Sequence, residues 1–274
     1  MNARATGSLP AIFSKSRPKF SSNTFMVRLP SNAAPAPTVP VQLLTRFTAR
    51  KRIRCFVFIA AKVRIFKPHM ELTFAITGAS GTIYAHRTLR MIADSGAVET
   101  VHLIMSGTAA TVAQVEMGVN LREATAEKIN AWLGLDAGSK MIRLWQLDNL
   151  AAKPSSGSSK QAGMMIVPCS MGTLGSIASG AGTNLIHRAA DVCLKEGRRL
   201  VVVPREAPYN AIHLENMLRL SRAGARILPA SPGFYHRPKT IEELVDHLCF
   251  RILDQFDIPH PARTQWTGNE VAEQ

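Results

Sequence analysis

The chain has 274 residues, enough for one large α/β domain or two small ones, and its 46% hydrophobic and 19% charged residues are typical of a folded protein in water. A net charge of +14 would suggest a nucleic-acid partner. However, residues 1–69 hold 13 of the 33 Lys and Arg and none of the 19 Asp and Glu, so the remainder is nearly neutral. We therefore expect no nucleic-acid binding. We also expect no membrane span, because the most apolar stretch of residues 1–69 ends far short of the roughly 20 residues required.

Residues 1–69 form a basic N-terminal extension that we expect to be disordered, since four prolines lie between Pro30 and Pro40. Its composition is similar to that of an organellar transit peptide, but it lacks a sustained amphipathic pattern. We favour translation that starts at Met70 and a cytoplasmic protein. Four separated cysteines with no Cys-x-x-Cys pair fit a reducing compartment, and predict neither a zinc site nor a disulfide framework. One domain, residues 70–274, is expected to follow.

Short apolar runs alternate with amphipathic segments from Met70 onward. The apolar runs predict strands at Leu72–Thr77, Val101–Met105, Gly163–Pro168, Leu200–Pro204 and Arg226–Leu228. The amphipathic segments predict helices at Thr82–Ser95, Thr108–Glu116, Asn184–Glu196, Asn210–Ala223 and Thr240–Phe256. The last helix starts with a Thr-Ile-Glu-Glu capping box. We predict a three-layer α/β fold, a Rossmann-like (flavodoxin-like) doubly wound parallel sheet, whose ligands bind at the carboxyl ends of the strands.

Two loops at predicted strand ends favour a phosphate-bearing ligand. The first, Thr77–Thr82, has the glycines of a tight turn and opens a helix whose free amides would attract a phosphate. Its spacing is not Gly-x-Gly-x-x-Gly, and Ser106 rather than an acidic residue ends the second strand, which disfavours a dinucleotide. The second loop, Cys169–Thr173, again has hydroxyls and a glycine at a helix start. Together the loops predict a mononucleotide site, with Cys169 as a buried structural thiol.

Charged and aromatic side chains mark further candidate positions. Arg205 and Glu206 follow the fourth strand directly, where Arg suits a phosphate and Glu can relay a proton; a structural ion pair between them is the alternative. Lys195 ends a helix, where it could instead complement the helix dipole. Arg251 lies in an apolar stretch of the last helix, where an Arg needs a partner. Two loops complete the set, Ser155–Ser159, which reads as a linker or lid, and Phe234–Pro238.

Seven motifs lie in these segments: ITGASG at Ile76–Gly81, SSGS at Ser155–Ser158, PCSMGTL at Pro168–Leu174, RAADVCLKE at Arg188–Glu196, VPREAP at Val203–Pro208, HLENMLRLSRAGA at His213–Ala225 and PGFYHRP at Pro232–Pro238. Together they resemble the flavin prenyltransferase (UbiX-type) family of the flavin-containing decarboxylase-like superfamily. The resemblance runs from about Leu72 to Trp266, and residues 1–69 have no counterpart in it.

The resemblance implies a role for each matching position. FMN would be held by Gly78, Ala79, Ser80, Ser106, Ser170, Met171, Gly172, Thr173 and Arg205. Dimethylallyl phosphate would be bound by Lys195, Arg188, Tyr235, Arg251 and Ser156. The catalytic residues would be Glu206, Lys195, Tyr235 and Glu116, the last of them near the flavin, while Ser156 and Ser158 would lie in a loop over it. Gly107 and Gly172 depart from the family pattern, because a lysine is common at both positions, and Gly107 is expected to loosen its turn.

The implied reaction transfers a dimethylallyl group from dimethylallyl phosphate to N5 and C6 of reduced FMN. Its product is the prenylated FMN that UbiD-type decarboxylases use in ubiquinone biosynthesis or aromatic-acid decarboxylation. The residues suit this chemistry, since Lys195, Arg251 and Arg205 would stabilise the departing phosphate and Glu206 could protonate it. A water-poor aromatic pocket would protect an allyl-cation-like species. The family further implies a metal-independent mechanism and a dodecamer with active sites between subunits.

Two other functions fit part of the same pattern. An FMN-dependent decarboxylase or oxidase on this scaffold would use a histidine base, for which His86 in the first predicted helix is a candidate. A non-catalytic flavin-binding or delivery protein would need neither Glu206 nor Lys195. The Arg205–Glu206 pair and the Tyr-His-Arg-Pro segment favour the prenyltransferase.

Overall fold

The computed structural model describes residues 70–260, and our prediction of a disordered extension at residues 1–69 lies outside the described residues. The strands are β1 (Met70–Ile76), β2 (Val98–Met105), β3 (Ile142–Trp145), β4 (Gly163–Cys169), β5 (Arg199–Pro204) and β6 (Arg226–Ile227). The helices are α1 (Thr82–Ser95), α2 (Gly107–Met117), α3 (Ala126–Trp132), α4 (Met171–Ala178), α5 (Leu185–Lys195), α6 (Ala211–Arg222) and α7 (Ile241–Asp254). A short 3-10 turn, η1 (Lys153–Ser155), precedes β4.

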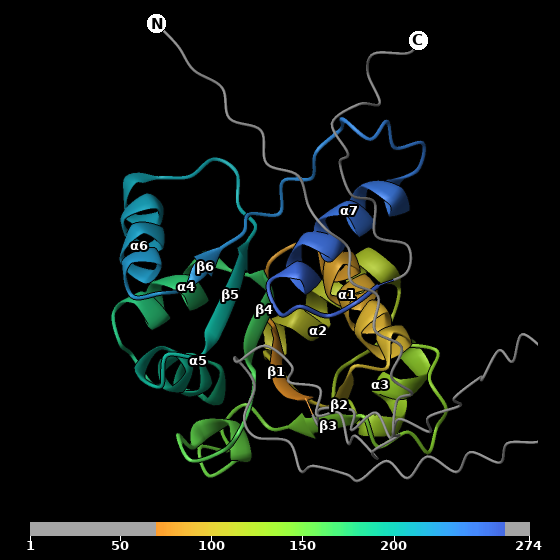
Figure 1. Ribbon diagram of the computed structural model, residues 1–274, viewed down its shortest axis with the longest axis horizontal. Helices are drawn as coiled ribbons and strands as arrows, with labels where there is room; N and C mark the ends of the chain where they lie inside the picture. The colour runs from red at the N-terminus through yellow and green to blue at the C-terminus, as the bar shows by residue number, and fades with distance from the viewer. Residues whose placement is uncertain (1–69, 261–274) are drawn as a thin grey trace, which may run out of the picture. The chain divides into compact units, whose positions relative to one another are not determined.

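The described strands form one parallel sheet in the order β3-β2-β1-β4-β5-β6. Helices α1, α2, α3 and α7 pack on one face of the sheet, and α4, α5 and α6 pack on the other, as Figure 1 shows. The strand order reverses between β1 and β4. This is the six-strand Rossmann order rather than the five-strand flavodoxin order, and it confirms the predicted doubly wound fold of three layers.

Alternate residues of each strand are buried in opposite cores. In β1, Phe74 lies in the core that α1 and α7 cover, while Ala75 lies in the core that α4 and α5 cover, and both are fully buried. Val201 and Val202 of β5 divide between the two cores in the same way. This burial on two sides explains why the strands are apolar without alternation. The carboxyl ends of the strands are thereby held side by side, and their loops form one edge of the sheet.

Asn184 and Thr240 cap the starts of their helices, as predicted. Asn184 caps α5, because its side-chain oxygen accepts from the amide of His187 at 3.0 Å. Thr240 caps α7 by accepting from the amide of Glu243 at 3.1 Å. The Glu243 carboxylate, however, accepts from the amide of Lys239 at 2.6 Å, one residue earlier than a capping box requires. The predicted capping box is therefore only half formed.

The sequence pattern predicts neither α3 nor β3. β3 has four residues, pairs with β2 on one side, and exposes Arg143 in its middle. α3 has seven residues, of which Ile129 and Asn130 are buried. Segments this short contain too few apolar positions to show a period.

Candidate active site

The two loops predicted to favour phosphate meet where the strand order reverses. Thr77, just after β1, donates its hydroxyl to the carbonyl of Pro168 at 2.9 Å and accepts from the amide of Ser170 at 2.8 Å. Thr77 itself is buried. The loop after β1 is therefore tied to the loop after β4 at a topological switch point, the position where doubly wound sheets bind ligands.

Gly78 lets the loop after β1 pass directly against the start of α2. A Cβ atom on Gly78 would lie 2.3 Å from Oγ1 and 2.6 Å from Cβ of Thr108. The Oγ1 atom of Thr108 is 3.0 Å from Oγ of Ser106, which caps α2 by accepting from the amide of Ala109 at 3.1 Å. The structure thus brings Gly78 and Ser106 of the predicted flavin site together, and only glycine fits at position 78.

Ser170 begins α4 in the same way that Ser106 begins α2. Its Oγ accepts from the amide of Thr173 at 3.4 Å and donates to the hydroxyl of Thr173 at 3.1 Å. Gly172 beside it is exposed, and a Cβ there would meet no atom within 4 Å. A Cβ on Gly107 would be equally unobstructed. Neither glycine is therefore required by packing at its Cβ position.

Arg205 links the loops from the β5 side. Its backbone amide donates to the carbonyl of Cys169 at 3.3 Å, and its side-chain Nε donates to the carbonyl of Ser80 at 3.1 Å. The side chain therefore crosses the end of β4 to reach the loop after β1. Glu206 accepts from the amide of Ala207 at 3.1 Å, and within residues 70–260 no ion pair joins it to Arg205. The alternative of a structural Arg205–Glu206 pair is therefore wrong.

Glu116, near the end of α2, occupies the amides at the start of α1. Its carboxylate accepts from the amide of Gly81 at 3.0 Å and from that of Thr82 at 2.8 Å. Partial burial alone would raise the pKa of Glu116, but hydrogen bonds from the Ser80 side chain and these amides outweigh it and lower the pKa below its ordinary value. The expectation of free amides at this helix start is wrong. Gly81 provides no side-chain cap, and Glu116 supplies one from another helix. Its role at the flavin stays a prediction.

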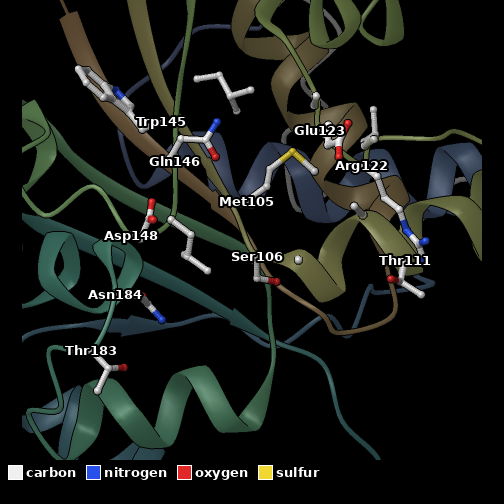
Figure 2. Close-up of a pocket in the computed structure, with 16 residues that line it drawn as sticks. Met105, Ser106, Thr111, Arg122, Glu123, Trp145, Gln146, Asp148, Thr183 and Asn184 are labelled. Atoms are coloured by element: carbon white, nitrogen blue, oxygen red, sulfur yellow. The ribbon is translucent and has the colours of Figure 1, made fainter.

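A cavity of about 800 Å³ opens at the carboxyl ends of β2 and β3. Figure 2 shows Ser106 between two groups of its lining side chains, with Asp148, Thr183 and Asn184 on one side and Thr111, Arg122 and Glu123 on the other. Ser106 is the one predicted flavin residue that lines it; the other lining residues were not predicted as site residues. Asn184 was the sequence signal that could have pointed to this cavity, because it predicts a helix start. A helix start at the carboxyl edge of a parallel sheet is a position where anions bind.

A second group of predicted residues lies at the opposite edge of the sheet. Lys195 ends α5 shortly before β5 begins, and its Nζ contacts Oε1 of Glu196 at 2.8 Å. The serine-rich loop passes over this helix end, since a Cβ on Gly157 would lie 2.9 Å from Nζ of Lys195. α5 packs there against η1, at the bottom of Figure 1. Ser156 therefore accompanies Lys195, as the resemblance implies, but neither residue lies at the strand-end edge with Arg205.

Arg251 and Arg188 each pair with a carboxylate of their own helix. In the last turn of α7, Arg251 contacts Asp254 at 3.1 Å, and in α5 Arg188 contacts Asp191 at 2.9 Å. Arg188 lies in the first turn of α5 and Arg251 in the last turn of α7, so the helix directions place them at opposite edges of the sheet. One chain therefore does not gather the predicted phosphate-binding cations at one place.

Tyr235 lies in the loop between β6 and α7, and its hydroxyl is 2.6 Å from Nε2 of His247. Beside it is a second cavity of about 500 Å³, lined by His236, Arg237, Lys239, Glu243, Asp246, His247 and Phe250. Tyr235 is thus held by a side chain that was not predicted as part of the site.

The residues invoked by alternative mechanisms have structural roles. His86 lies 3.1 Å from the carbonyl of Trp132 and packs on the Trp132 ring; burial lowers its pKa. The Cys169 thiol is fully buried, which raises its pKa and confirms it as a structural cysteine. Within residues 70–260, no three His, Cys, Asp or Glu side chains lie together as metal ligands would, and no helix is long and apolar enough to cross a membrane.

Comparison with known proteins identifies the family. A family model described as Flavoprotein matches residues 62–253. Flavin prenyltransferase UbiX of Pseudomonas aeruginosa is 46% identical over 199 residues, which cover 72% of this chain and 93% of that protein. Flavin prenyltransferase UbiX of Halalkalibacterium halodurans is 45% identical over 196 residues, which cover 71% of this chain and 92% of that protein.

Solved structures agree with these relatives. A dodecameric FMN-dependent UbiX-like decarboxylase from Escherichia coli O157:H7 is 40% identical with a TM-score of 0.64, covering 73% of this chain and 100% of that one. AnUbiX, in complex with FMN and dimethylallyl pyrophosphate, is 38% identical with a TM-score of 0.64, covering 73% and 98%. The chain belongs to the UbiX family of flavin prenyltransferases.

Proposed function

We propose that this chain transfers a dimethylallyl group from dimethylallyl phosphate to N5 and C6 of reduced FMN. One observation carries the proposal: Arg205 crosses the switch point to Ser80, beside two hydroxyl-bearing helix starts, which is an arrangement suited to a phosphomonoester. The complex of AnUbiX with FMN and dimethylallyl pyrophosphate supports the choice of both substrates.

The strand-end edge would bind the flavin. Because only Nε of Arg205 binds the Ser80 carbonyl, the two terminal nitrogens of its guanidinium would be available to the ligand phosphate. The hydroxyls of Ser106 and Ser170 cap their helices and are fixed in direction by those bonds. The proposed FMN residues are Gly78, Ala79, Ser80, Ser106, Ser170, Met171, Gly172, Thr173 and Arg205.

The prenyl donor would be bound by the second group, Lys195, Arg188, Tyr235, Arg251 and Ser156. Their cations would neutralise the phosphate as the allylic C–O bond breaks and the phosphate leaves with the electron pair. Glu206 would supply a proton to that phosphate. Glu116 would act from near the flavin by holding the loop after β1.

Since Lys195 and Ser156 lie at the amino edge of the sheet and Arg205 lies at the carboxyl edge of the same chain, the complete site would form between subunits. The dodecameric structure of the UbiX-like protein from Escherichia coli supports such an assembly. In the assembled protein, Lys195 of one subunit would face Arg205 of another. We further propose that the product passes to a UbiD-type decarboxylase and that the protein works in the cytoplasm.

The decisive experiment mixes the purified full chain with reduced FMN and dimethylallyl phosphate without oxygen, followed by mass spectrometry of the flavin. A parallel reaction receives dimethylallyl pyrophosphate, and the proposal expects more product from the monophosphate. Glu206→Gln and Lys195→Ala should abolish product while FMN still binds, and the exposed Lys128→Ala on α3 serves as a matched control. Wild-type protein that forms no prenylated flavin would contradict the proposal.

Mixed assemblies test the shared site separately. Lys195→Ala and Arg205→Ala chains should each be inactive alone, and co-expressed chains should regain activity because some sites then receive both intact residues. If the mixture stays inactive while the wild type makes product, the site lies within one chain.

A further inference from the structure

Tyr235 is part of a packed aromatic cluster. The ring of His247 meets it edge to face, with centroids 5.2 Å apart and planes at 86°, and the two side chains share the 2.6 Å contact. His236 stacks on His247 at 4.5 Å and 16°. A Cβ on Gly233 would lie 2.8 Å from Cε1 of Tyr235, so this loop position needs glycine for the tyrosine to lie where it does. The geometry of the tyrosyl hydroxyl is therefore set by its neighbours.

The protonation state of His247 decides which group donates across this contact. A neutral imidazole offers one ring nitrogen as acceptor and carries its hydrogen on the other. With Nε2 as the acceptor, the hydroxyl of Tyr235 donates across the 2.6 Å contact. The hydrogen of the neutral His247 ring then lies on Nδ1, which is buried without a partner among residues 70–260. In this state His247 holds the tyrosyl hydrogen, which a ligand phosphate then cannot accept.

The surroundings favour neutral His247 when no phosphate is bound. Burial lowers the pKa of His247, and the nearby His236 and Arg251 lower it further. The charged and titratable groups around it, from its own helix, the preceding loop and α1, are Glu243, Asp246, Arg251, His236, Arg237, Lys239 and Arg87. Asp246 is already paired with Arg87, and Glu243 accepts from the Lys239 amide, so both acids have other partners.

We propose that His247 is a positioning residue that sets the direction of the Tyr235 hydroxyl hydrogen. When neutral, His247 accepts that hydrogen. When it takes up a proton from solvent, Nε2–H donates to the tyrosyl oxygen, and the hydroxyl can then donate to a phosphate oxygen of the prenyl donor. The inference rests on the proposed function, since it takes Tyr235 as a ligand of that phosphate.

Proton uptake at His247 is thereby coupled to binding of the prenyl donor. A phosphate bound at Arg251, four residues further along the same helix, offsets one of the charges that disfavour protonated His247. Phosphate and proton therefore bind cooperatively, and each raises the affinity for the other. A purely structural histidine would have no such coupling.

The test compares the KM for dimethylallyl phosphate in wild type, His247→Phe and His247→Gln between pH 8 and pH 5.5. Phenylalanine keeps the stacking but cannot hydrogen-bond, and glutamine can accept or donate without titrating. We expect the KM of His247→Phe, divided by the KM of wild type, to rise about tenfold as the pH falls. A tenfold change corresponds to the contribution of one charge-assisted hydrogen bond. Titration of the substrate phosphate cancels in this ratio. His247→Gln should lower KM relative to His247→Phe at pH 5.5 without restoring the pH dependence, and the KM for FMN should not change.

Two further measurements separate this inference from the function on which it rests. On a Tyr235→Phe background, replacing His247 should no longer change the pH profile. By ¹⁵N NMR of the imidazole, inorganic phosphate added to the full chain should raise the pKa of His247. A pH-independent KM ratio, or a His247 pKa that phosphate does not move, overturns the inference even where the wild type makes prenylated flavin.

Discussion

A side chain at Gly78 should damage both stability and flavin binding. The added Cβ would lie 2.3 Å from Oγ1 of Thr108, about 1 Å inside ordinary van der Waals contact, and 2.6 Å from its Cβ. No rotation of the threonine moves its Cβ, so the loop after β1 must shift. Overpacking of this kind costs about 1–3 kcal/mol. Because the shifted loop is the one that Arg205 holds through Ser80, a displacement near 1 Å should lower the prenylation rate by about 100-fold.

Gly172→Ala is the matched control for Gly78→Ala. It adds the same methyl group to the first turn of α4, beside the other switch-point loop, where a Cβ meets nothing within 4 Å, so it should not lower the free energy of unfolding. Urea unfolding at equal protomer concentration measures the free energies, and anaerobic initial rates measure activity. Thr108→Gly should partly restore the Gly78→Ala variant, since it removes both clashing atoms. Equal losses in the two alanine variants, or no loss in either, would refute the packing argument.

Two further variants test the strand-end edge. Glu116→Gln should lower the free energy of unfolding by about 1 kcal/mol at pH 7, because it weakens the cap on α1. The pKa of Glu116 in the folded protein lies below its ordinary value of 4.5. The charged carboxylate therefore stabilises the fold above pH 4.5, and this stabilisation is lost as the pH falls through the pKa of the folded state. The difference in unfolding free energy between wild type and Glu116→Gln should therefore shrink below pH 4.5, and a constant difference down to pH 3 would contradict the charge-based cap. Arg205→Lys keeps the positive charge but loses the planar guanidinium that could bind the Ser80 carbonyl and a phosphate at the same time. The Kd for FMN, measured by flavin fluorescence, should therefore rise about tenfold, with little change in Tm. Unchanged FMN affinity in Arg205→Lys would show that Arg205 does not contact the flavin phosphate.

The strands and most helices follow from local pattern because burial on both faces makes β4 apolar throughout, and β1 and β5 apolar except at Glu71, Thr73 and Arg199. β3 could not be predicted from the pattern, because its four residues, with Arg143 exposed between apolar neighbours, resemble a loop as much as a strand. The Glu116 cap on α1 could not be predicted from the sequence for a different reason. It joins residues 34 and 35 apart in sequence, and only the packing of α2 beside α1 brings them together.

Topology already separates Lys195 from Arg205. In a parallel sheet every strand ends at one edge, so Arg205, directly after β5, must lie at the carboxyl edge. Lys195 ends the helix that leads into β5, so it must lie at the amino edge of the same chain. The sequence therefore predicts that a single chain cannot bring both residues to one small ligand. What it cannot predict is the surface through which a second chain would do so.

The cations assigned to the prenyl donor have a common feature that bears on catalysis. Lys195, Arg251 and Arg188 each contact a carboxylate one or three residues away, at 2.8, 3.1 and 2.9 Å. All three side chains are more than 40% exposed, and ion pairs between such groups contribute little, because water solvates the separated charges almost as well. A phosphate dianion can therefore replace these carboxylates at small cost. If a second subunit covers the site and excludes water, as proposed, the same cations would interact with the departing phosphate in a lower dielectric, where each contact is stronger. The local carboxylates would then keep the cations ordered and solvated until assembly and substrate binding give them a stronger partner.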